Sequence, residues 1–123
     1  MCQIRRNVLL CAECLEAQYY SFAAYGRGLN KTLRSGGPRA AGGKKALLNP
    51  TALALAKDIA KDEITHVAFL HSVLKSVKSD IPCPKVNIGG AFAAAANAAF
   101  GTTLKTPFTP YDFVPTTLLH DRD

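Results

Sequence analysis

The amino-acid sequence predicts an all-α fold, and three observations lead to that prediction. Apolar residues recur at intervals of three and four over residues 4–30 and again over residues 50–77, which is the spacing of amphipathic helices. A third segment, residues 89–100, is rich in alanine, the residue with the highest helix propensity. A chain of 123 residues is long enough for one small domain, which we place at residues 1–123.

The first predicted helix covers residues 4–30. This stretch contains no proline, and its apolar residues are spaced to lie on one face. They are Val8, Ala12, Leu15, Tyr19, Phe22, Gly26 and Leu29. Gly26, Gly28 and Asn30 predict where the helix ends, because glycine and asparagine gather at helix C-termini.

The second predicted helix covers residues 50–77, after a glycine-rich loop at 31–49. Asn49 offers an N-cap side chain, and Pro50 suits the first helical position, where a missing N–H costs nothing. The expected apolar face consists of Leu55, Ala56, Ile59, Val67, Leu70, Val73, Leu74 and Val77. We expect the two long helices to pack antiparallel.

Prolines end the second helix and shape the remainder of the chain. Pro82 and Pro84 stop the helix, because proline removes a backbone donor and restricts the residue before it. After the short alanine-rich helix at 89–100, further prolines predict an irregular segment at 101–123. The two long helices and these shorter pieces amount to part of a helical bundle.

The net charge of +6 does not identify a partner. Much of the excess lies in and near the glycine-rich loop, at Arg27, Lys31, Arg34, Arg39, Lys44 and Lys45. A solvated loop explains these residues better than a binding patch, because no nucleic-acid motif accompanies them. No apolar run reaches the ~20 residues of a membrane span, and no signal peptide is visible, so we assign no compartment.

The strongest chemical signal is Glu63 followed three residues later by His66. A helical wheel places both within the apolar stripe of the second helix, facing the core. A buried carboxylate must pair, lose its charge or bind a metal. An inward Glu-x-x-His pair is a ligand arrangement of carboxylate-bridged metal sites in helical bundles. The alternative is a buried ion pair or a hydrogen-bonded core histidine.

The first helix offers two further carboxylates, Glu13 and Glu16. The wheel places Glu16 near the centre of the apolar stripe and Glu13 at its margin, and solvent-facing positions remain the alternative for both. With one imidazole, such hard oxygen ligands suit iron or manganese. We therefore predict a non-haem metal site from Glu13, Glu16, Glu63 and His66.

Cysteine usage and the remaining histidines give weaker signals. Cys11 and Cys14 form a Cys-x-x-Cys pair inside a helix, where two small packing residues are expected rather than a thiol redox motif. The four cysteines lack the regular spacing of a disulfide framework, which favours a reducing compartment. His71 lies at the edge of the Glu63 face and is expected to be partly exposed.

Five segments, in order, resemble the desiccation-related proteins with a ferritin-like domain. They read LCAECLEAQYYSFAAYGRGL, GGPRAAGGKKALLNP, DEITHVAFLHSVL, IPCPKVNIGGAFAAAANAAFG and PFTPYDF. The resemblance implies a ferritin-like four-helix bundle, with Glu63 and His66 as the Glu-x-x-His ligands. A tyrosine seven residues after the ligand glutamate is typical of related di-iron bundles, which favours Glu13 with Tyr20. Relatives of this kind are often exported or organellar.

The resemblance also implies a departure, because family members continue into two more long helices where this chain reads VPTTLLHDRD. We therefore expect a truncated, partial bundle with half of a metal site, completed by a homodimer or another helical partner. This chain alone is not expected to be catalytically active. The alternatives are a non-catalytic stress or interaction protein without metal, and a thiol redox protein using Cys11 and Cys14.

Overall fold

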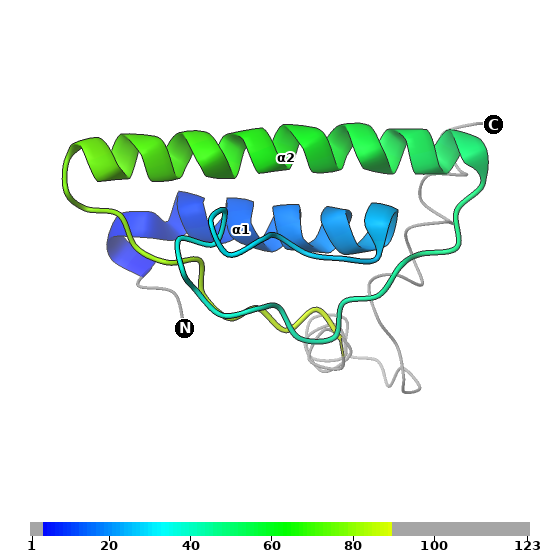
Figure 1. Cartoon of the computed structure of the whole chain (residues 1–123), viewed down its shortest axis with the longest axis horizontal. Coiled ribbons are helices and arrows are strands. Elements are labelled where there is room, and N and C mark those ends of the chain that lie inside the picture. The colour runs from blue at the N-terminus through cyan, green and yellow to red at the C-terminus, as the bar shows by residue number, and fades with distance from the viewer. Residues whose placement is uncertain (1–3, 90–123) are drawn as a thin grey trace.

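The computed structural model describes residues 4–89, which contain two long helices lying side by side (Figure 1). α1 spans Ile4–Tyr25 and α2 spans Pro50–Ser76. The chain runs along α1 and returns along α2 in the opposite direction, so the helices are antiparallel. Within residues 4–89 the only β-type pairing is an isolated bridge between Ala41 and Asn87. The predicted all-α class is confirmed.

α2 begins and ends as its local sequence dictates. Asn49 has extended backbone angles, φ −70° and ψ 167°, and its side-chain Oδ1 accepts a 2.8 Å hydrogen bond from the Ala52 N–H. Pro50 follows at the first helical position. At the other end Val77 donates its N–H back to Leu74 O, and the prediction of residues 50–77 differs from α2 by one residue.

α1 ends at Tyr25, so the expected extension to residue 30 was wrong. Gly26 adopts the left-handed φ of +73° and turns the chain out of the helix, while its N–H still bonds Phe22 O at 2.7 Å. The chain then folds back, and the Gln18 side chain accepts the Leu29 N–H at 2.8 Å. Near its start α1 is also bent at Asn7, whose φ of −138° and ψ of 30° are not helical.

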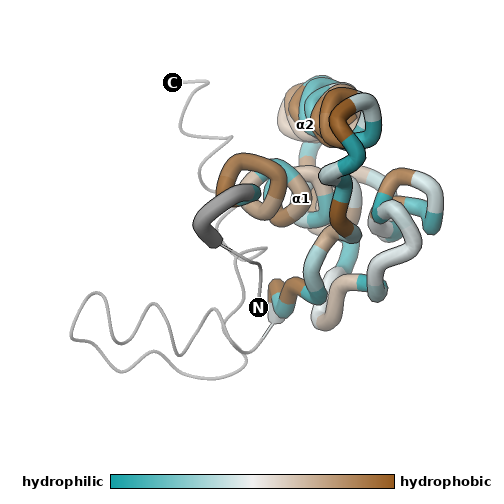
Figure 2. The backbone as a smooth tube through the Cα atoms, turned by 90° about the vertical axis from the view of Figure 1, so that its left-hand side faces the viewer, coloured by the Kyte–Doolittle hydropathy of each residue, from teal (hydrophilic) through white to brown (hydrophobic). Residues whose placement is uncertain are grey.

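The loop 26–49 and the link 77–89 lie along α1 on the side away from α2 (Figures 1 and 2). They join through three backbone hydrogen bonds, from Ala41 N to Val86 O and from Ile88 N to Ala41 O, both at 2.8 Å, and from Cys83 N to Arg34 O at 2.9 Å. Another bond, from Ala46 N to Ala23 O at 3.0 Å, ties the loop to α1. α1 is therefore covered on two sides, by α2 and by these irregular segments.

This double cover changes which residues of α1 are buried. The most buried positions are mostly small, namely Leu10, Cys14, Ala17, Gln18, Ser21, Ala23 and Ala24. Val8 and Ala12, which the sequence placed on the apolar face, are exposed. Small side chains let α2 and the loop approach α1 closely, and periodicity alone does not register that approach.

α2 buries a narrower stripe than the sequence predicted. Ala52, Ala56, Ala60 and Val67 are fully buried, each with 0% of its surface exposed. Leu55, Val73 and Val77 belonged to the predicted apolar face but are exposed. Among the described residues, α1 covers one side of α2, and the neighbouring apolar stripe, which includes Leu55 and Val73, is exposed.

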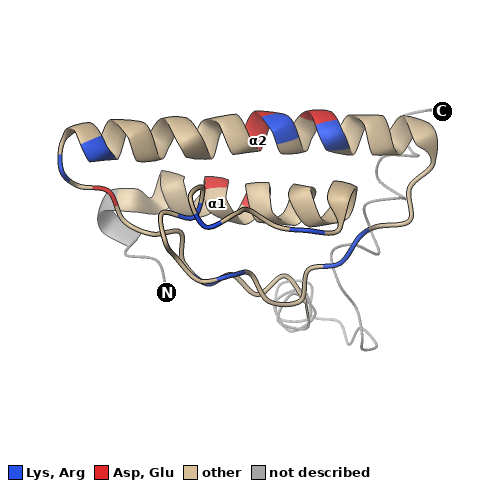
Figure 3. Cartoon of the chain, viewed as in Figure 1, with Lys and Arg blue, Asp and Glu red and all other residues tan. Residues whose placement is uncertain are grey.

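Basic residues lie along the irregular segments and also on α2, and the acids of α1 lie on the part of α1 that runs beside α2 (Figure 3). Most of the basic loop residues are exposed, as expected for a solvated loop. Arg34 departs from that expectation because it is buried, donating from Nε to Gly37 O at 2.8 Å and from a terminal nitrogen to Leu29 O at 2.6 Å. The short helix and irregular tail expected at 89–100 and 101–123 lie, apart from Gly89, outside the described residues.

Candidate metal centre

Three of the predicted ligands meet where α1 and α2 face one another. Glu13 comes from α1, and Glu63 and His66 come from successive turns of α2. His66 Nδ1 lies 3.3 Å from Glu13 Oε2 and 3.6 Å from Glu63 Oε2. One donor atom from each of the three side chains lies within 4.8 Å of the other two. The spacing of three residues on α2 therefore aims both of its side chains at the same glutamate of α1.

The three side chains differ in exposure. Those of Glu13 and Glu63 expose only 17% and 14% of their surface, whereas that of His66 exposes 54%. We expected His66 to face the core, but its side chain is exposed at the surface of the described residues. By helical spacing, His66 lies on the exposed stripe of α2 that also carries Phe69 and Val73.

Burial and neighbouring acids raise the pKa of Glu63 to about 7. The largest cause is the loss of solvation, followed by the hydrogen bond and negative charge of Glu13 and then those of Glu16. The pKa of His66 is raised too, mainly by its hydrogen bond to Glu13, while partial desolvation opposes the rise. The group thus combines crowded carboxylates with an imidazole that favours its charged form.

Glu63 Oε2 is buried and has no hydrogen-bond partner. A buried carboxylate oxygen normally has a partner, because leaving it unpaired costs its full desolvation energy. The orphaned oxygen faces the imidazole and the Glu13 carboxylate. Two carboxylates and one imidazole are the donor set that Fe²⁺ or Mn²⁺ takes, so the residues present fit such an ion.

Glu16 lies at the edge of this group. Its side chain is exposed, yet its hydrogen bond and its charge contribute to the raised pKa of Glu63. The helical wheel favoured Glu16 over Glu13 as the inward acid, and the structure reverses that order. The reason is the second cover on α1, because the centre of its buried face points between α2 and the loop.

Tyr20 is a neighbour of the acidic group that the residue pattern alone did not single out. Burial is the main cause of its raised pKa, and the charges of Glu16 and Glu63 add to the effect. Tyr20 also packs edge-on against Tyr19, with ring centroids 4.9 Å apart. The phenol therefore keeps its proton beside the carboxylates.

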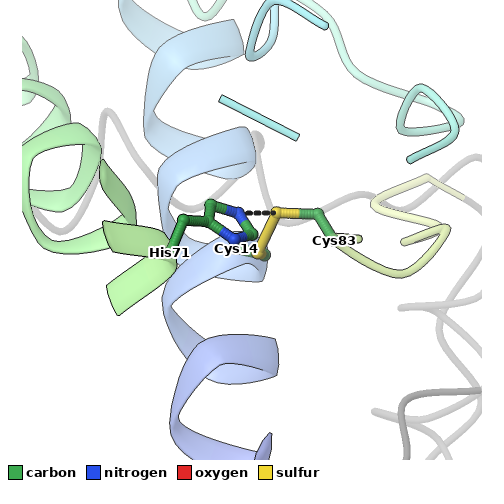
Figure 4. A group of neighbouring side chains, drawn as sticks. All are labelled: Cys14, His71 and Cys83. Carbon is green, nitrogen blue, oxygen red and sulfur yellow. Dashed lines mark hydrogen bonds between the residues drawn. A yellow bond between two sulfur atoms is a disulfide. The ribbon is translucent and has the colours of Figure 1, made fainter. Parts of the chain in front are cut away.

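A second group of side chains was not predicted. Cys14 forms a disulfide with Cys83, and His71 lies against the pair, with Nε2 at 3.6 Å from Cys83 Sγ (Figure 4). His71 is buried, so the expectation of partial exposure was wrong. The link after α2 covers it, and no periodicity within α2 reveals that contact.

The disulfide also corrects two expectations about the cysteines. Cys14 is bonded to Cys83 and not to Cys11, so the Cys-x-x-Cys pair is not a redox disulfide and Cys14 is not merely a packing residue. Because Cys14 and Cys83 are bonded, the cysteines also no longer favour a reducing compartment, as the sequence had suggested. Pairing across 69 residues depends on the return of the link to α1, which local spacing does not encode.

Comparisons with known proteins agree with this helical architecture. A family model described as a ferritin-like domain matches residues 5–118. The chain is 35% identical over 103 residues to desiccation-related protein PCC13-62 of Craterostigma plantagineum, a match that covers 80% of this chain and 32% of that protein. It is 34% identical over 103 residues to ferritin-like catalase Nec2 of Nesocodon mauritianus, again with 80% and 32% covered.

The chain thus spans only 32% of the length of either relative. No solved structure matches it significantly. Neither described helix is both long enough and apolar enough to cross a membrane.

Proposed function

This chain belongs to the family of ferritin-like domains, and on that premise we propose that it is a stress-protein domain with a non-haem iron or manganese half-site. Glu13, Glu63 and His66 would hold the ion, with Glu16 beside them. The sequence relation to a desiccation-related protein supports the stress role. The metal role rests on the side chains themselves.

The observation that carries the proposal is the orphaned Oε2 of Glu63. It is buried without a hydrogen-bond partner, next to a second carboxylate and an imidazole nitrogen. A cation between these groups would satisfy the oxygen and screen the repulsion between Glu13 and Glu63. Without a cation, one of the two carboxylates keeps a proton near neutral pH, which the raised pKa of Glu63 reflects.

Each residue has a distinct part in this proposal. Glu63 is the buried anchor, Glu13 supplies the second oxygen from the other helix, and His66 adds the nitrogen at the open side. Glu16 supplies negative charge, and Tyr20 offers a phenolic proton nearby. A bound iron or manganese ion would supply one-electron redox chemistry toward oxygen or peroxide.

The named catalase among the relatives makes peroxide breakdown the reaction to assay. Two helices provide ligands for half of a dinuclear site, whereas ferritin-like carboxylate proteins draw ligands from four. We therefore expect little turnover from this chain unless further helices complete the site.

The open stripe of α2 supports a helical partner. Leu55, Phe69, Val73 and Val77 recur at helical spacing on the side where His66 is exposed, and Phe69 and Val77 each expose more than half of their surface. Covering this stripe with further helices would bury both its apolar surface and the open side of His66. A second copy or another helical chain would serve, and sedimentation equilibrium at several concentrations distinguishes a dimer from a monomer.

Metal content tests the proposal. The chain is purified, stripped with a chelator, reloaded with Mn²⁺ or Fe²⁺ under exclusion of oxygen, desalted and analysed for bound metal. Wild type should retain the ion, whereas Glu63→Ala and His66→Ala should lose it. Asp62→Ala removes an exposed acid from the adjacent position and is the matched control that should retain it.

The second candidate is a stress or interaction protein that keeps the fold and uses no metal. It predicts equal metal content in all four proteins and a melting temperature that Mn²⁺ does not raise. A ligand that binds only the folded chain must stabilise it, so an unchanged melting temperature favours this candidate.

A further inference from the structure

We propose that Cys14, His71 and Cys83, once their disulfide is reduced, form a second metal site that takes Zn²⁺ through two thiolates and one imidazole. This site shares no residue with the half-site of Glu13, Glu63 and His66, and it does not depend on the proposed function. Soft sulfur ligands with one imidazole select zinc over the iron or manganese of the carboxylate group.

Three separate segments bring the donors together, as Figure 4 shows. Cys14 lies on α1, His71 on α2, and Cys83 on the link that follows α2. One donor atom from each lies within 4.8 Å of the other two. All three side chains are buried, with Cys14 at 0%, Cys83 at 1% and His71 at 4% exposure, so water is largely excluded from competing for the ion.

The imidazole is oriented for this task by a carboxylate. Asp80 Oδ1 lies 2.7 Å from His71 Nδ1, and Asp80 Oδ2 accepts a 2.8 Å hydrogen bond from the Ser35 hydroxyl. Burial alone would raise the pKa of Asp80, but the hydrogen bonds from His71 and Ser35 outweigh it and lower that pKa. In the neutral imidazole that donates its Nδ1–H to this carboxylate, the Nε2 lone pair faces the sulfurs. Histidines that bind metals are commonly held by a carboxylate in this way.

The oxidised state does not use that lone pair. Nε2 lies 3.6 Å from Cys83 Sγ, but a disulfide sulfur carries no proton to donate. A neutral imidazole therefore gains no hydrogen bond at Nε2 from this contact. In the reduced state, a thiol proton or a metal ion can occupy the position between the nitrogen and the two sulfurs.

A dithiol reductant can convert the disulfide into the two thiols that the zinc site needs. The Cys14–Cys83 disulfide takes up two electrons and two protons to give two thiols, and the dithiol becomes a disulfide. Zn²⁺ then displaces both thiol protons and binds the two thiolates and Nε2, with water in the fourth position. A disulfide oxidant that takes up two electrons from the thiolates, and is itself reduced to a dithiol, re-forms the Cys14–Cys83 bond and releases the ion.

The surrounding structure permits the rearrangement. Reduction requires the two sulfurs to separate, and Cys83 lies on irregular backbone outside both helices, where its N–H donates a 2.9 Å hydrogen bond to Arg34 O. His71 also lines a surface pocket of about 320 Å³ together with Thr32, Leu33, Ala68, Ser72 and Lys75. This pocket gives small solutes an approach to the imidazole side of the group.

Cobalt binding to the reduced chain tests the proposal. A Glu63→Ala/His66→Ala background removes the carboxylate half-site, a phosphine reductant opens the disulfides, and Co²⁺ is titrated without oxygen. We expect one Co²⁺ per chain with sulfur-to-cobalt charge-transfer absorption, which Zn²⁺ abolishes by displacement. The oxidised chain should show no such absorption. Asp80→Asn should weaken zinc binding by roughly 10- to 100-fold, as loss of a carboxylate that orients a ligand does.

Two cysteine variants locate the site. Cys83→Ser should lose the charge-transfer absorption, whereas Cys11→Ser, the matched control, should keep it. The proposal is overturned if reduced chain that retains its helical circular dichroism gives no thiolate absorption, or if Cys83→Ser or His71→Ala binds Co²⁺ as the background does. If reduction unfolds the chain, restoration of helicity by Zn²⁺ supports the site, and its failure to restore helicity overturns it.

Discussion

Glu13 on α1 and His66 on α2 meet at 3.3 Å between Oε2 and Nδ1, although 53 residues separate them in the sequence. This contact joins the two helices beside Glu63, whose Oε2 lies 3.6 Å from the same nitrogen. Its energetic value as an exposed ion pair is small, because solvent screens it and two side chains must be held in place. Its significance is positional, since it brings an oxygen and a nitrogen donor to the orphaned carboxylate.

In the metal-free protein, we expect the free energy of unfolding to fall as pH rises from about 4.5 to about 7. The folded chain raises the pKa of Glu63 from 4.5 to about 7, so it binds that proton more tightly than the unfolded chain does. The contribution is therefore complete below pH 4.5 and is lost as pH passes 7. Urea unfolding across this range measures the slope. Glu63→Gln should make the free energy of unfolding depend less on pH than Asp62→Asn does. An identical slope in both variants would show that Glu63 is not the source of the pH dependence.

Bound manganese should reverse that dependence. Glu63 and His66 must both release a proton to bind the ion, so affinity should rise with pH, by up to about a hundredfold per pH unit where both groups are protonated. Calorimetric titration of Mn²⁺ in two buffers of different ionisation enthalpy counts the protons released. If the affinity for Mn²⁺ does not vary between pH 5.5 and 7, Glu63 is not a ligand of the ion.

The disulfide between Cys14 and Cys83 should contribute substantially to stability. It closes a loop with a sequence separation of 69 residues, for which the chain-entropy relation gives about 4 kcal/mol as an upper figure. Guanidinium unfolding of Cys14→Ala/Cys83→Ala against oxidised wild type measures the loss. An unchanged unfolding midpoint would show that the disulfide adds no stability beyond that of the remaining contacts.

Two glycines of the loop offer a matched test of its packing. Gly36 and Gly42 have nearly the same left-handed φ, +78° and +79°, but a Cβ at Gly36 meets nothing within 4 Å. A Cβ at Gly42 would lie 2.6 Å from the backbone of Gly89. Gly36→Ala should cost about 1 kcal/mol for the left-handed backbone alone. Gly42→Ala should cost clearly more stability, because its Cβ would also push the link 77–89 away from the loop. Equal losses of stability in urea unfolding would mean that the two segments do not pack here.

Local signals predicted much of the fold. The Asn49–Pro50 start of α2, its end before Pro82, and the turn between Glu63 and His66 all depend on residues within a few positions of each other. Capping, proline geometry and helical spacing act at that range, so sequence alone suffices for them. Pairing two helices that each carry an apolar face predicted a first-helix carboxylate near those two residues, but helical spacing favoured Glu16, and only the family resemblance favoured Glu13.

Non-local packing accounts for what the sequence did not reveal. The loop and link cover α1 opposite α2, which rotates its buried face toward Cys14 and Ala17 and shortens the helix to Tyr25. The same segments bury Arg34 and His71 and bring Cys83 to Cys14. None of these contacts lies within one helical turn, so periodicity carries no information about them. His66 is exposed for the converse reason, since the apolar stripe around it has no neighbour within the described residues.

The most direct measurement is electron spin echo spectroscopy of the Mn²⁺-loaded chain, which detects ligand nitrogen through its coupling to the metal. In the Cys14→Ala/Cys83→Ala background, which removes the thiol site, the half-site predicts one imidazole nitrogen coupled to manganese. That coupling should vanish in His66→Ala and persist in His71→Ala. A signal unchanged by His66→Ala, or the absence of nitrogen coupling with Mn²⁺ bound, would contradict the assignment of Glu13, Glu63 and His66 as the metal centre.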